Sequence, residues 1–479
     1  MFLQHTKLNY SHINRILILL VTFFYFICYH YIFYGNYCLS DSYYYLSIID
    51  NINNGQGFFD SIYSDMKPPI TPQLGFVFLS SLLINIFNIS FDILHYMSFL
   101  SYLFFLSTLC LIFKIYRMLD VQNKESYWLL WCFILPFQNY IYCYYQPLND
   151  SIHLFFFYFC LYLILLLLKD INIKTIIFLF ICSIFISIFR IQGSLIFLSA
   201  ILISLLCRRR KQFFIFLLCF IGSLTSPYLF LKYFNIVVNY DDFRELSFDL
   251  YSAAFFLNQL YNTIFDILPK IIIGDPARIK FLSFCLFPGI FLFSLKNFKR
   301  LNFLKVSENE KLLLLIIIIQ ILFFQIFFQI ERYLLPISPL LFFIIYKILD
   351  YRFKNVLLKL FILALCLSSL FRLKDVFLNY NFYENKQLRS NLDKEIPLEY
   401  NLLSEEPRQT YYLFGQSSYL KYSDIKNNFP LVIVGSADYL NKIIIEMDKY
   451  NFNYNIETLN YKIRKFRNLY LNIYIIYFI

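Results

Sequence analysis

Long runs of apolar residues, each bounded by polar or basic residues, follow one another along most of the chain. Runs of about 17 to 25 apolar residues have the length of membrane-spanning helices. The pattern predicts about eleven such helices, over 13–33, 93–113, 127–145, 151–168, 175–190, 193–207, 212–232, 280–295, 311–329, 334–349 and 356–371. The sequence therefore predicts a mainly α-helical, polytopic membrane protein.

The apolar segment 74–89 is long enough to be considered as a further span. Basic residues near the ends of membrane helices gather on the cytoplasmic side. If 74–89 lies along the outer surface, twenty Lys and Arg residues fall on one side of the membrane and eight on the other, counted as far as Arg332. If it crosses, the basic cluster 208–211 falls outside. The charges therefore predict that 74–89 is a juxtamembrane helix.

This topology places two long connections, 34–92 and 233–279, on the outer face, and the second of them includes an apolar surface helix. Residues 372–479 follow the last span and are more polar, so we expect them outside as well. Within them "PLVIVGSADYLNKIIIEMDKY" predicts a strand, a turn at Gly435-Ser436 and then a helix that Ser436 caps. The last eleven residues are short for a span and predict a final strand. We expect a membrane domain over 1–371 and a small external α/β domain over 372–479.

The composition excludes a soluble globular chain, because 59% of the residues are hydrophobic and only 15% are charged, against about 25% in soluble domains. A net charge of +11 is compatible with nucleic-acid binding. The basic residues instead lie at the ends of apolar runs, so no nucleic-acid partner is predicted. The eleven cysteines show no metal-ligand spacing. We therefore predict no cofactor, and a divalent metal is possible but not favoured.

The loop after the first span carries the residues of chemical interest. Asp41 lies at the outer end of that span, and a run of tyrosines and isoleucines at helical spacing follows it as far as Gly55. This pattern predicts an amphipathic helix in the plane of the membrane surface that ends at a glycine. The tyrosines are expected in an interfacial belt or, alternatively, stacked on a sugar. The Pro68-Pro69 pair predicts an extended elbow after Lys67.

Several of these segments resemble the GT-C glycosyltransferases, in particular the branch of protein O-mannosyltransferases and lipid A aminoarabinose transferases. "DSYYYLSIIDNINNGQGFF" and "KPPITPQLGFVFLSSLLINIF" are similar to the first external loop of that family. "QPLNDSIHLFF" is similar to its second acidic site, "SIFRIQGSLIF" to a segment with an arginine at the next outer boundary, and "ERYLLPISPLLFFI" to a late helix start. The resemblance covers most of 1–200 and about 325–345.

The resemblance implies transfer of a sugar from a polyprenyl-phosphate carrier to a glycan, lipid or protein acceptor at the outer face of the membrane. An acceptor hydroxyl or amine is a poor nucleophile, so a carboxylate has to take its proton, and Asp41 is the candidate general base. Lys67, Arg190 and Arg332 are candidates to bind the donor phosphate, whose charge grows as it leaves. Asp150 is a candidate for the acceptor site or for a second acid. Direct displacement with one base inverts the anomeric configuration.

One position departs from the family pattern. Many relatives carry Asp-Glu at the start of the loop, whereas this chain has Asp41 followed by Ser42. Asp41 is therefore the sole acid of the motif. A role that needs a carboxylate pair, including metal binding or activity itself, is open to question in this chain.

Each candidate also has a purely structural interpretation. Lys67 is able to reach lipid headgroups without binding substrate. Asp150 is able to cap the helix that follows it, and Glu331 is able to neutralise the adjacent Arg332. His153 lies on the same helical face as Asp150 and is expected to be a satisfied polar neighbour.

Other functions remain open at this point. A transporter or flippase of lipid-linked sugars would carry ionisable residues in the middle of its spans and paired repeats, and the spans here have few charges. A polysaccharide polymerase or ligase would depend on arginines of the large loop, such as Arg244 and Arg278. A non-catalytic relative would keep the scaffold alone. We expect an integral protein of the bacterial inner membrane with its active site on the outer face.

Overall fold

The structure is a computed structural model of the whole chain. It describes residues 10–33, 40–62, 68–69, 73–87, 93–135, 148–238, 253–263, 267–268, 307–325, 331–348, 359, 362–363, 365–366, 395–396, 400–405, 418–419, 430–449, 453–464 and 470–478, some of them by their backbone alone.

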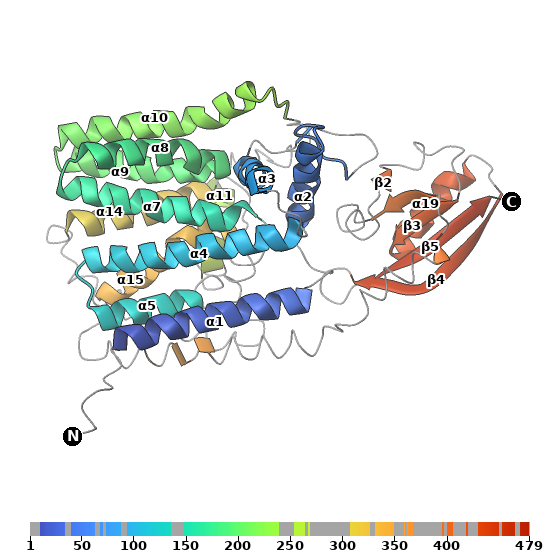
Figure 1. Cartoon of the computed structure of the whole chain (residues 1–479), viewed down its shortest axis with the longest axis horizontal. Coiled ribbons are helices and arrows are strands. Elements are labelled where there is room, and N and C mark those ends of the chain that lie inside the picture. Colours follow the sequence, from blue (N-terminus) through green and yellow to red (C-terminus); the bar gives the residue numbers. More distant parts are fainter. Residues whose placement is uncertain are drawn as a thin grey trace, which may run out of the picture.

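Apolar helices make up a bundle in which the long helices lie side by side (Figure 1). They are α1 (Tyr10–Phe33), α4 (Ile93–Met118), α5 (Asn123–Ile134), α7 (Asn149–Lys169), α8 (Ile173–Phe189), α9 (Leu195–Leu206), α10 (Arg210–Tyr233), α14 (Glu308–Phe324) and α15 (Ser338–Ile348), with short 3-10 helices η2 (Ile191–Ser194) and η6 (Glu331–Ile337). In the described part of the chain, helices over His95–Met118, Asn149–Lys169 and Arg210–Tyr233 are long and apolar enough to cross a membrane. The prediction of a helical protein with several apolar helices is confirmed. The number eleven stays a prediction, and the span 280–295 lies outside the described residues.

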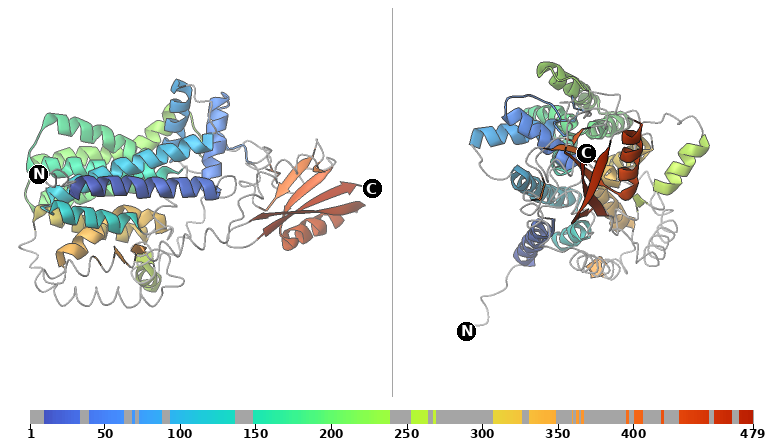
Figure 2. Two further views of the ribbon diagram at one scale, coloured as in Figure 1. Left: turned by 60° about the horizontal axis from the view of Figure 1, so that its bottom comes forward. Right: turned by 90° about the vertical axis from the view of Figure 1, so that its right-hand side faces the viewer.

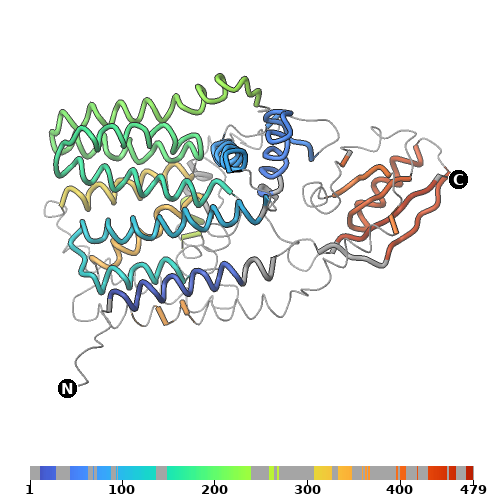
Figure 3. Tube along the Cα trace, viewed as in Figure 1, coloured from blue at the N-terminus to red at the C-terminus, as the bar shows by residue number. Residues whose placement is uncertain are grey.

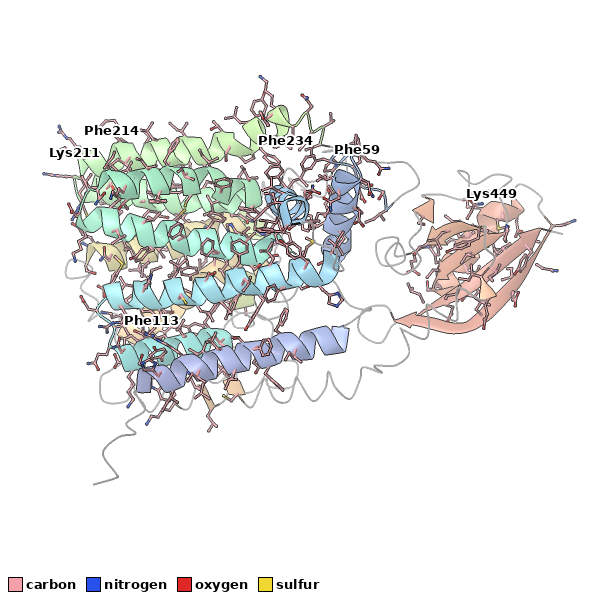
Figure 4. The ribbon with its side chains drawn as sticks, viewed as in Figure 1. Phe59, Phe113, Lys211, Phe214, Phe234 and Lys449 are labelled. Atoms are coloured by element: carbon pink, nitrogen blue, oxygen red, sulfur yellow. The ribbon has the colours of Figure 1, made fainter. Side chains whose placement is uncertain are left out.

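Helix α7 lies inside the bundle and α10 on its surface, as the tube trace shows (Figure 3). In α7, 72% of the most apolar stretch is buried within the protein, against 28% in α10. The side chain of Phe214 points away from the bundle on the outer side of α10 (Figure 4) and is 60% exposed. Apolar side chains exposed along a whole helix face are expected where that face meets lipid.

Two shorter helices, α2 (Ser40–Asn53) and α3 (Gly75–Phe87), run across the end of the bundle instead of along it (Figures 1 and 2). We call this end the outer end. The basic cluster that includes Lys211 lies at the opposite end, far from Phe59 and Phe234 (Figure 4). The arrangement agrees with the prediction that 74–89 does not cross.

The face of α2 that carries isoleucines and tyrosines packs against protein. Ile48 and Ile49 are fully buried in a cluster with residues of α3 and α7, and Tyr44 and Tyr45 are buried with them. The expectation of an interfacial tyrosine belt is therefore wrong for Tyr44 and Tyr45, because their rings fill the space between the surface helices and the bundle.

Helix α2 ends at a glycine, as predicted. Gly55 has a φ of 75°, a conformation that costs other residues energy, and its N–H donates to the carbonyl of Ile52. The next N–H, of Gln56, donates to the carbonyl of Asn51 at 2.8 Å. These bonds satisfy carbonyls that the end of a helix leaves without partners.

The C-terminal part contains a five-stranded sheet next to the outer end of the bundle (Figure 2). Its strands are β1 (Asn401–Ser404), β2 (Ser418–Tyr419), β3 (Leu431–Gly435), β4 (Tyr454–Arg464) and β5 (Tyr470–Phe478), in the order β2-β1-β3-β5-β4. Strand β1 pairs in parallel with β2 and β3, whereas β5 is antiparallel to both β3 and β4. The strand predicted before the turn at Gly435-Ser436 is confirmed as β3, which extends through Gly435, and the predicted final strand is confirmed as β5.

Helix α19 (Ala437–Asp448) covers one face of the sheet. Ile443 and Met447 pack on a cluster that includes Ile433. Ser436 caps the helix, because its hydroxyl accepts from the N–H of Tyr439 at 3.3 Å. The predicted cap is therefore confirmed.

The division into two domains at residue 371 stays a prediction. The predicted surface helix in the loop 233–279 corresponds in part to α11 (Ala253–Asn262).

Candidate functional site

Asp150 lies in the first turn of α7 at the outer end of the bundle. The residue at the N-cap is Leu148, which makes no side-chain cap bond, and the helix begins at Asn149. The interpretation of Asp150 as a helix cap is therefore wrong. A carboxylate in the first turn is still favoured by the positive end of the helix dipole.

Arg190 meets this carboxylate from the neighbouring helix. It is the C-cap residue of α8, and its Nη2 lies 2.7 Å from Oδ1 of Asp150. The side chains of Arg190 and Asp150 are only 6% and 5% exposed. Since α7 and α8 form an antiparallel hairpin, the N-terminal end of one helix and the C-terminal end of the other come together, and both dipoles favour the charges placed there. Two of the predicted site residues thus form one buried ion pair.

The ring of Tyr333 completes the surroundings of Arg190. The guanidinium carbon lies 4.6 Å from the centre of this ring, a cation–π geometry. Tyr333 belongs to η6, and the hydroxyl of Tyr158 on α7 holds that segment by donating to the carbonyl of Pro336 at 2.7 Å. The late "RYLLP" segment is therefore brought to the same place as the ion pair.

A small cavity lies between these groups. Its lining includes Asp150, His153, Arg190, Gln192 and Tyr333, and it holds about 10 Å³, close to the room that one water molecule needs. A cavity of this size with several polar walls suits a water molecule or the hydroxyl or amine of a larger molecule that approaches from outside.

His153 contributes a hydrogen-bonding atom to this cavity. The residue is 3% exposed, and in the described part of the chain no group forms a hydrogen bond with its Nδ1. The expectation that His153 is a satisfied neighbour is wrong for this atom. A buried polar atom without a partner is costly, which is a reason to expect a bound water or substrate group beside it.

Asn149 joins the surface helices to α7. Its Nδ2 donates to the hydroxyl of Tyr45 on α2 at 2.9 Å and to the carbonyl of Gln73 at 2.7 Å, and its Oδ1 accepts from the N–H of Phe76 on α3 at 3.2 Å. The side chain is buried, with 1% exposed. One amide therefore aligns α2, α3 and α7 directly beside Asp150.

Asp41 lies in the first turn of α2, about one turn before Tyr45. The helix that carries Asp41 is thus bonded to the residue that precedes Asp150. The side chains of Asp41 and Arg332 and the whole of Lys67 lie outside the described residues, although the backbone of Arg332 belongs to η6 directly before Tyr333. Their roles stay predictions.

A metal site in a protein is usually formed by several His, Cys, Asp or Glu side chains that lie close together. In the part of the chain that the structure describes, no such cluster is present. The buried pair of Asp150 and Arg190 is a poor metal site because the cation of the pair already occupies the carboxylate.

The sequence did not indicate the roles of Asn149, Gln192 and Tyr333. Each is a neighbour of a predicted residue, within two positions of Asp150, Arg190 and Arg332 respectively. This adjacency in the sequence could have identified them, since residues that flank a charged site residue at a helix end are expected to line the same site.

The fold is similar to one of known structure. The crystal structure of ArnT from Cupriavidus metallidurans bound to undecaprenyl phosphate matches with a TM-score of 0.58 over 96% of this chain and 97% of that chain, at 11% sequence identity. No family model matches the chain, and no curated protein sequence does. The resemblance to the GT-C glycosyltransferases is confirmed at the level of the fold.

Proposed function

We propose that this chain is a membrane glycosyltransferase that moves a sugar from a polyprenyl-phosphate donor to an acceptor at the outer face of the membrane. The observation that carries the proposal is the likeness to ArnT over almost the whole of both chains, because the structure of ArnT was determined with undecaprenyl phosphate bound. The motifs around Asp41, Asp150 and Arg190 support it independently, since they were assigned to this fold from sequence alone.

Asp41 acts as the general base in this proposal. The acceptor oxygen or nitrogen attacks the anomeric carbon while the carboxylate of Asp41 takes the proton from the attacking atom. The bond between the anomeric carbon and the phosphate oxygen breaks, and the polyprenyl phosphate leaves with the electron pair. One displacement without a covalent enzyme intermediate inverts the anomeric centre.

Basic side chains stabilise the leaving phosphate. Lys67, Arg190 and Arg332 are the proposed groups, because developing negative charge is stabilised most by cations that are already in position. Arg190 is paired with Asp150, but a guanidinium has five N–H donors. It is therefore able to keep this carboxylate and offer other N–H groups to a phosphate.

Asp150 belongs to the acceptor-binding site in this proposal. Its carboxylate forms part of the wall of the small cavity together with His153 and Gln192. The cavity is too small for a sugar ring and suits a single hydroxyl or amine. The acceptor would insert this group, while the rest of the molecule lies outside the cavity.

The location follows from the same proposal. We place the protein in the bacterial inner membrane with α2, α3 and the C-terminal sheet on the outer face, since the basic cluster near Lys211 lies at the other end of the bundle. Its partners are then a polyprenyl-phosphate-linked sugar, membrane lipids and a glycan, lipid or protein acceptor.

A transfer assay tests the function. Membranes that contain the wild type, Asp41→Asn or Asp170→Asn are given radiolabelled undecaprenyl-phosphate sugars, and release or transfer of the label is measured. Asp170 is exposed at the opposite end of α7, so its variant is the matched control. We expect transfer by the wild type and the control and a loss of about 100-fold to 10,000-fold in Asp41→Asn, the contribution of a general base. Equal rates in all three would refute the assignment of Asp41, and no transfer from any donor by folded wild type would refute the function.

A further inference from the structure

The loop that follows α2 is attached to its own helix by buried hydrogen bonds. Nδ2 of Asn51 donates to the carbonyl of Phe59 at 2.7 Å. The side chain of Asp60 is only 5% exposed, and its Oδ1 accepts from the hydroxyl of Ser47 at 2.7 Å and from the N–H of Ile62 at 3.0 Å. Ser47 belongs to α2, so one carboxylate joins the end of the loop to the middle of that helix.

The same loop is bonded to the C-terminal sheet. The carbonyl of Ile62 accepts from the N–H of Ser418 at 2.9 Å, and both residues are fully buried. Ser418 belongs to β2, the strand at the edge of the sheet. Residues 60–62 therefore cover an edge that a sheet otherwise leaves open to other chains.

Hydrogen bonds within the sheet link β2 to the neighbouring strands. The hydroxyl of Ser418 accepts from the N–H of Ser404 on β1 at 3.0 Å, and β1 lies beside β3. A chain of buried hydrogen bonds thus runs from Ser47 through Asp60 and Ile62 into the sheet. Hydrogen bonds to a charged acceptor in such a place are stronger than neutral ones.

We propose that Asp60 is a positioning residue, which fixes α2 to the edge of the C-terminal sheet and so holds Asp41 at the site. Ser47 follows Asp41 by less than two turns of the same helix, so the bond at Ser47 sets the place of the whole first half of α2. This inference rests on the proposed function, because it assigns the task of the attachment to sugar transfer. It also gives the C-terminal sheet a part in catalysis that the motifs around the site do not.

Substitutions at Asp60 and Ser418 test separately the contact of the loop with α2 and its contact with the sheet. Asp60→Ala removes the hydrogen bonds from Ser47 and Ile62, whereas Asp60→Asn keeps an oxygen that is able to accept them. Ser418→Pro removes the N–H that binds Ile62 and also the hydroxyl that accepts from Ser404 on β1. Ser418→Ala is its matched control, because it keeps the N–H and removes only the hydroxyl.

The experiment uses the full chain in lipid nanodiscs. Hydrogen exchange is measured for peptides of α2, β1 and α7, and in parallel the kcat of sugar transfer and the affinity for undecaprenyl phosphate are measured. We expect Asp60→Ala and Ser418→Pro to speed exchange in α2 by about tenfold, the effect of losing one such bond, with exchange in α7 unchanged. The kcat should fall by about tenfold to a hundredfold, as a displaced catalytic group predicts. The affinity for undecaprenyl phosphate should change less than about twofold, and Asp60→Asn should restore most of the rate.

Each outcome decides a different point. Unchanged exchange in α2 in both Asp60→Ala and Ser418→Pro overturns the attachment. Faster exchange with an unchanged kcat overturns the positioning role. If the wild type transfers no sugar, the proposed function and the positioning role both fail, while the exchange data still decide whether the attachment exists. If Asp60→Ala does not fold, the comparison of Ser418→Pro with Ser418→Ala gives the same decision.

Discussion

Two buried carboxylates at the outer end of the molecule are held in different ways. Asp150 faces a full positive charge on Arg190 at 2.7 Å, whereas Asp60 accepts from a hydroxyl and a backbone N–H at 2.7 and 3.0 Å. Both side chains are 5% exposed. The first lies beside a cavity, and the second lies in the contact between a loop and a sheet.

The difference indicates different tasks. Burying two opposite charges costs desolvation energy that their attraction only partly offsets, so the pair of Asp150 and Arg190 is a weak source of stability. Such a pair next to a cavity is suited to chemistry, because its charges act on whatever enters. Asp60 is surrounded by fixed donors and is suited to holding α2 in place. Substitutions of Asp to Asn, which remove the charge but keep the shape of the side chain, should therefore affect stability differently at Asp150 and at Asp60.

The largest effect is expected when one member of the ion pair is removed. Asp150→Ala or Arg190→Ala leaves the other charge buried and uncompensated, and the free energy of unfolding should fall by about 3 to 5 kcal/mol. Denaturant titration in detergent micelles measures this loss. Joint replacement by Asp150→Leu and Arg190→Met should cost far less than the sum of the two single changes. Additive losses would show that the two charges do not depend on each other.

The substitution of Asp60 sharpens the comparison. Asp60→Ala should lower the free energy of unfolding by about 1.5 to 3 kcal/mol, because the buried N–H of Ile62 loses its acceptor and the hydroxyl of Ser47 keeps only the carbonyl of Tyr44. Asp60→Asn should cost less than about 1 kcal/mol, since its amide oxygen still accepts. Asp150→Asn, in contrast, should be as harmful as Asp150→Ala, because Arg190 needs the charge. The same titration decides the point, and equal costs for Asp60→Asn and Asp150→Asn would remove the distinction.

A third change tests how closely α3 approaches the ion pair. A Cβ on Gly75 would lie 2.8 Å from Cδ1 of Phe189 and 2.9 Å from Cγ2 of Ile188, directly before Arg190. Gly75→Ala should therefore cost about 1 to 3 kcal/mol by overpacking. In Gly222→Ala, the nearest atom to the new Cβ is 3.3 Å away at the end of the Phe180 ring, so we expect little change. Equal melting temperatures for both variants would contradict the close contact.

The smallest effect is expected far from the site. Ser436→Ala removes the cap of α19, whose loss should cost about 1 kcal/mol of the stability of the C-terminal part. Exchange of the amides at the start of α19 should rise, while the rate of sugar transfer stays within a factor of about two. A large loss of transfer would mean that α19 contributes to the site.

Much of the fold was predictable because it depends on local patterns. The apolar runs predict most of the described bundle helices, and the distribution of basic residues indicates correctly that 74–89 lies across the bundle end as α3. The strand before Ser436 and the final strand also follow from local sequence. The burial of Tyr44 and Tyr45 was not predictable, because it depends on the contact of α2 with α3 and α7.

The site was predictable only in part. Helices α7 and α8 are joined by a short turn, and about 1.5 Å per residue brings 150 and 190 to the same end of the hairpin. The sequence therefore allows both residues at one boundary, but their contact depends on how the two helices rotate against each other. The sequence did not indicate a role for Asp60, since its bond to Ser47 and the bond from Ser418 to the nearby Ile62 depend on tertiary contacts.

We propose that the lipid-linked sugar binds at the outer end, between α2 and the ion pair. Photo-crosslinking with a polyprenyl phosphate that carries a photoreactive group near the phosphate, followed by peptide mapping, tests it most directly. We expect labelled peptides from α2, from the start of α7 and from η2 or η6, and loss of the label when undecaprenyl phosphate is added in excess. Label that undecaprenyl phosphate does not displace, or that maps to the end of the bundle near Lys211, would contradict the account.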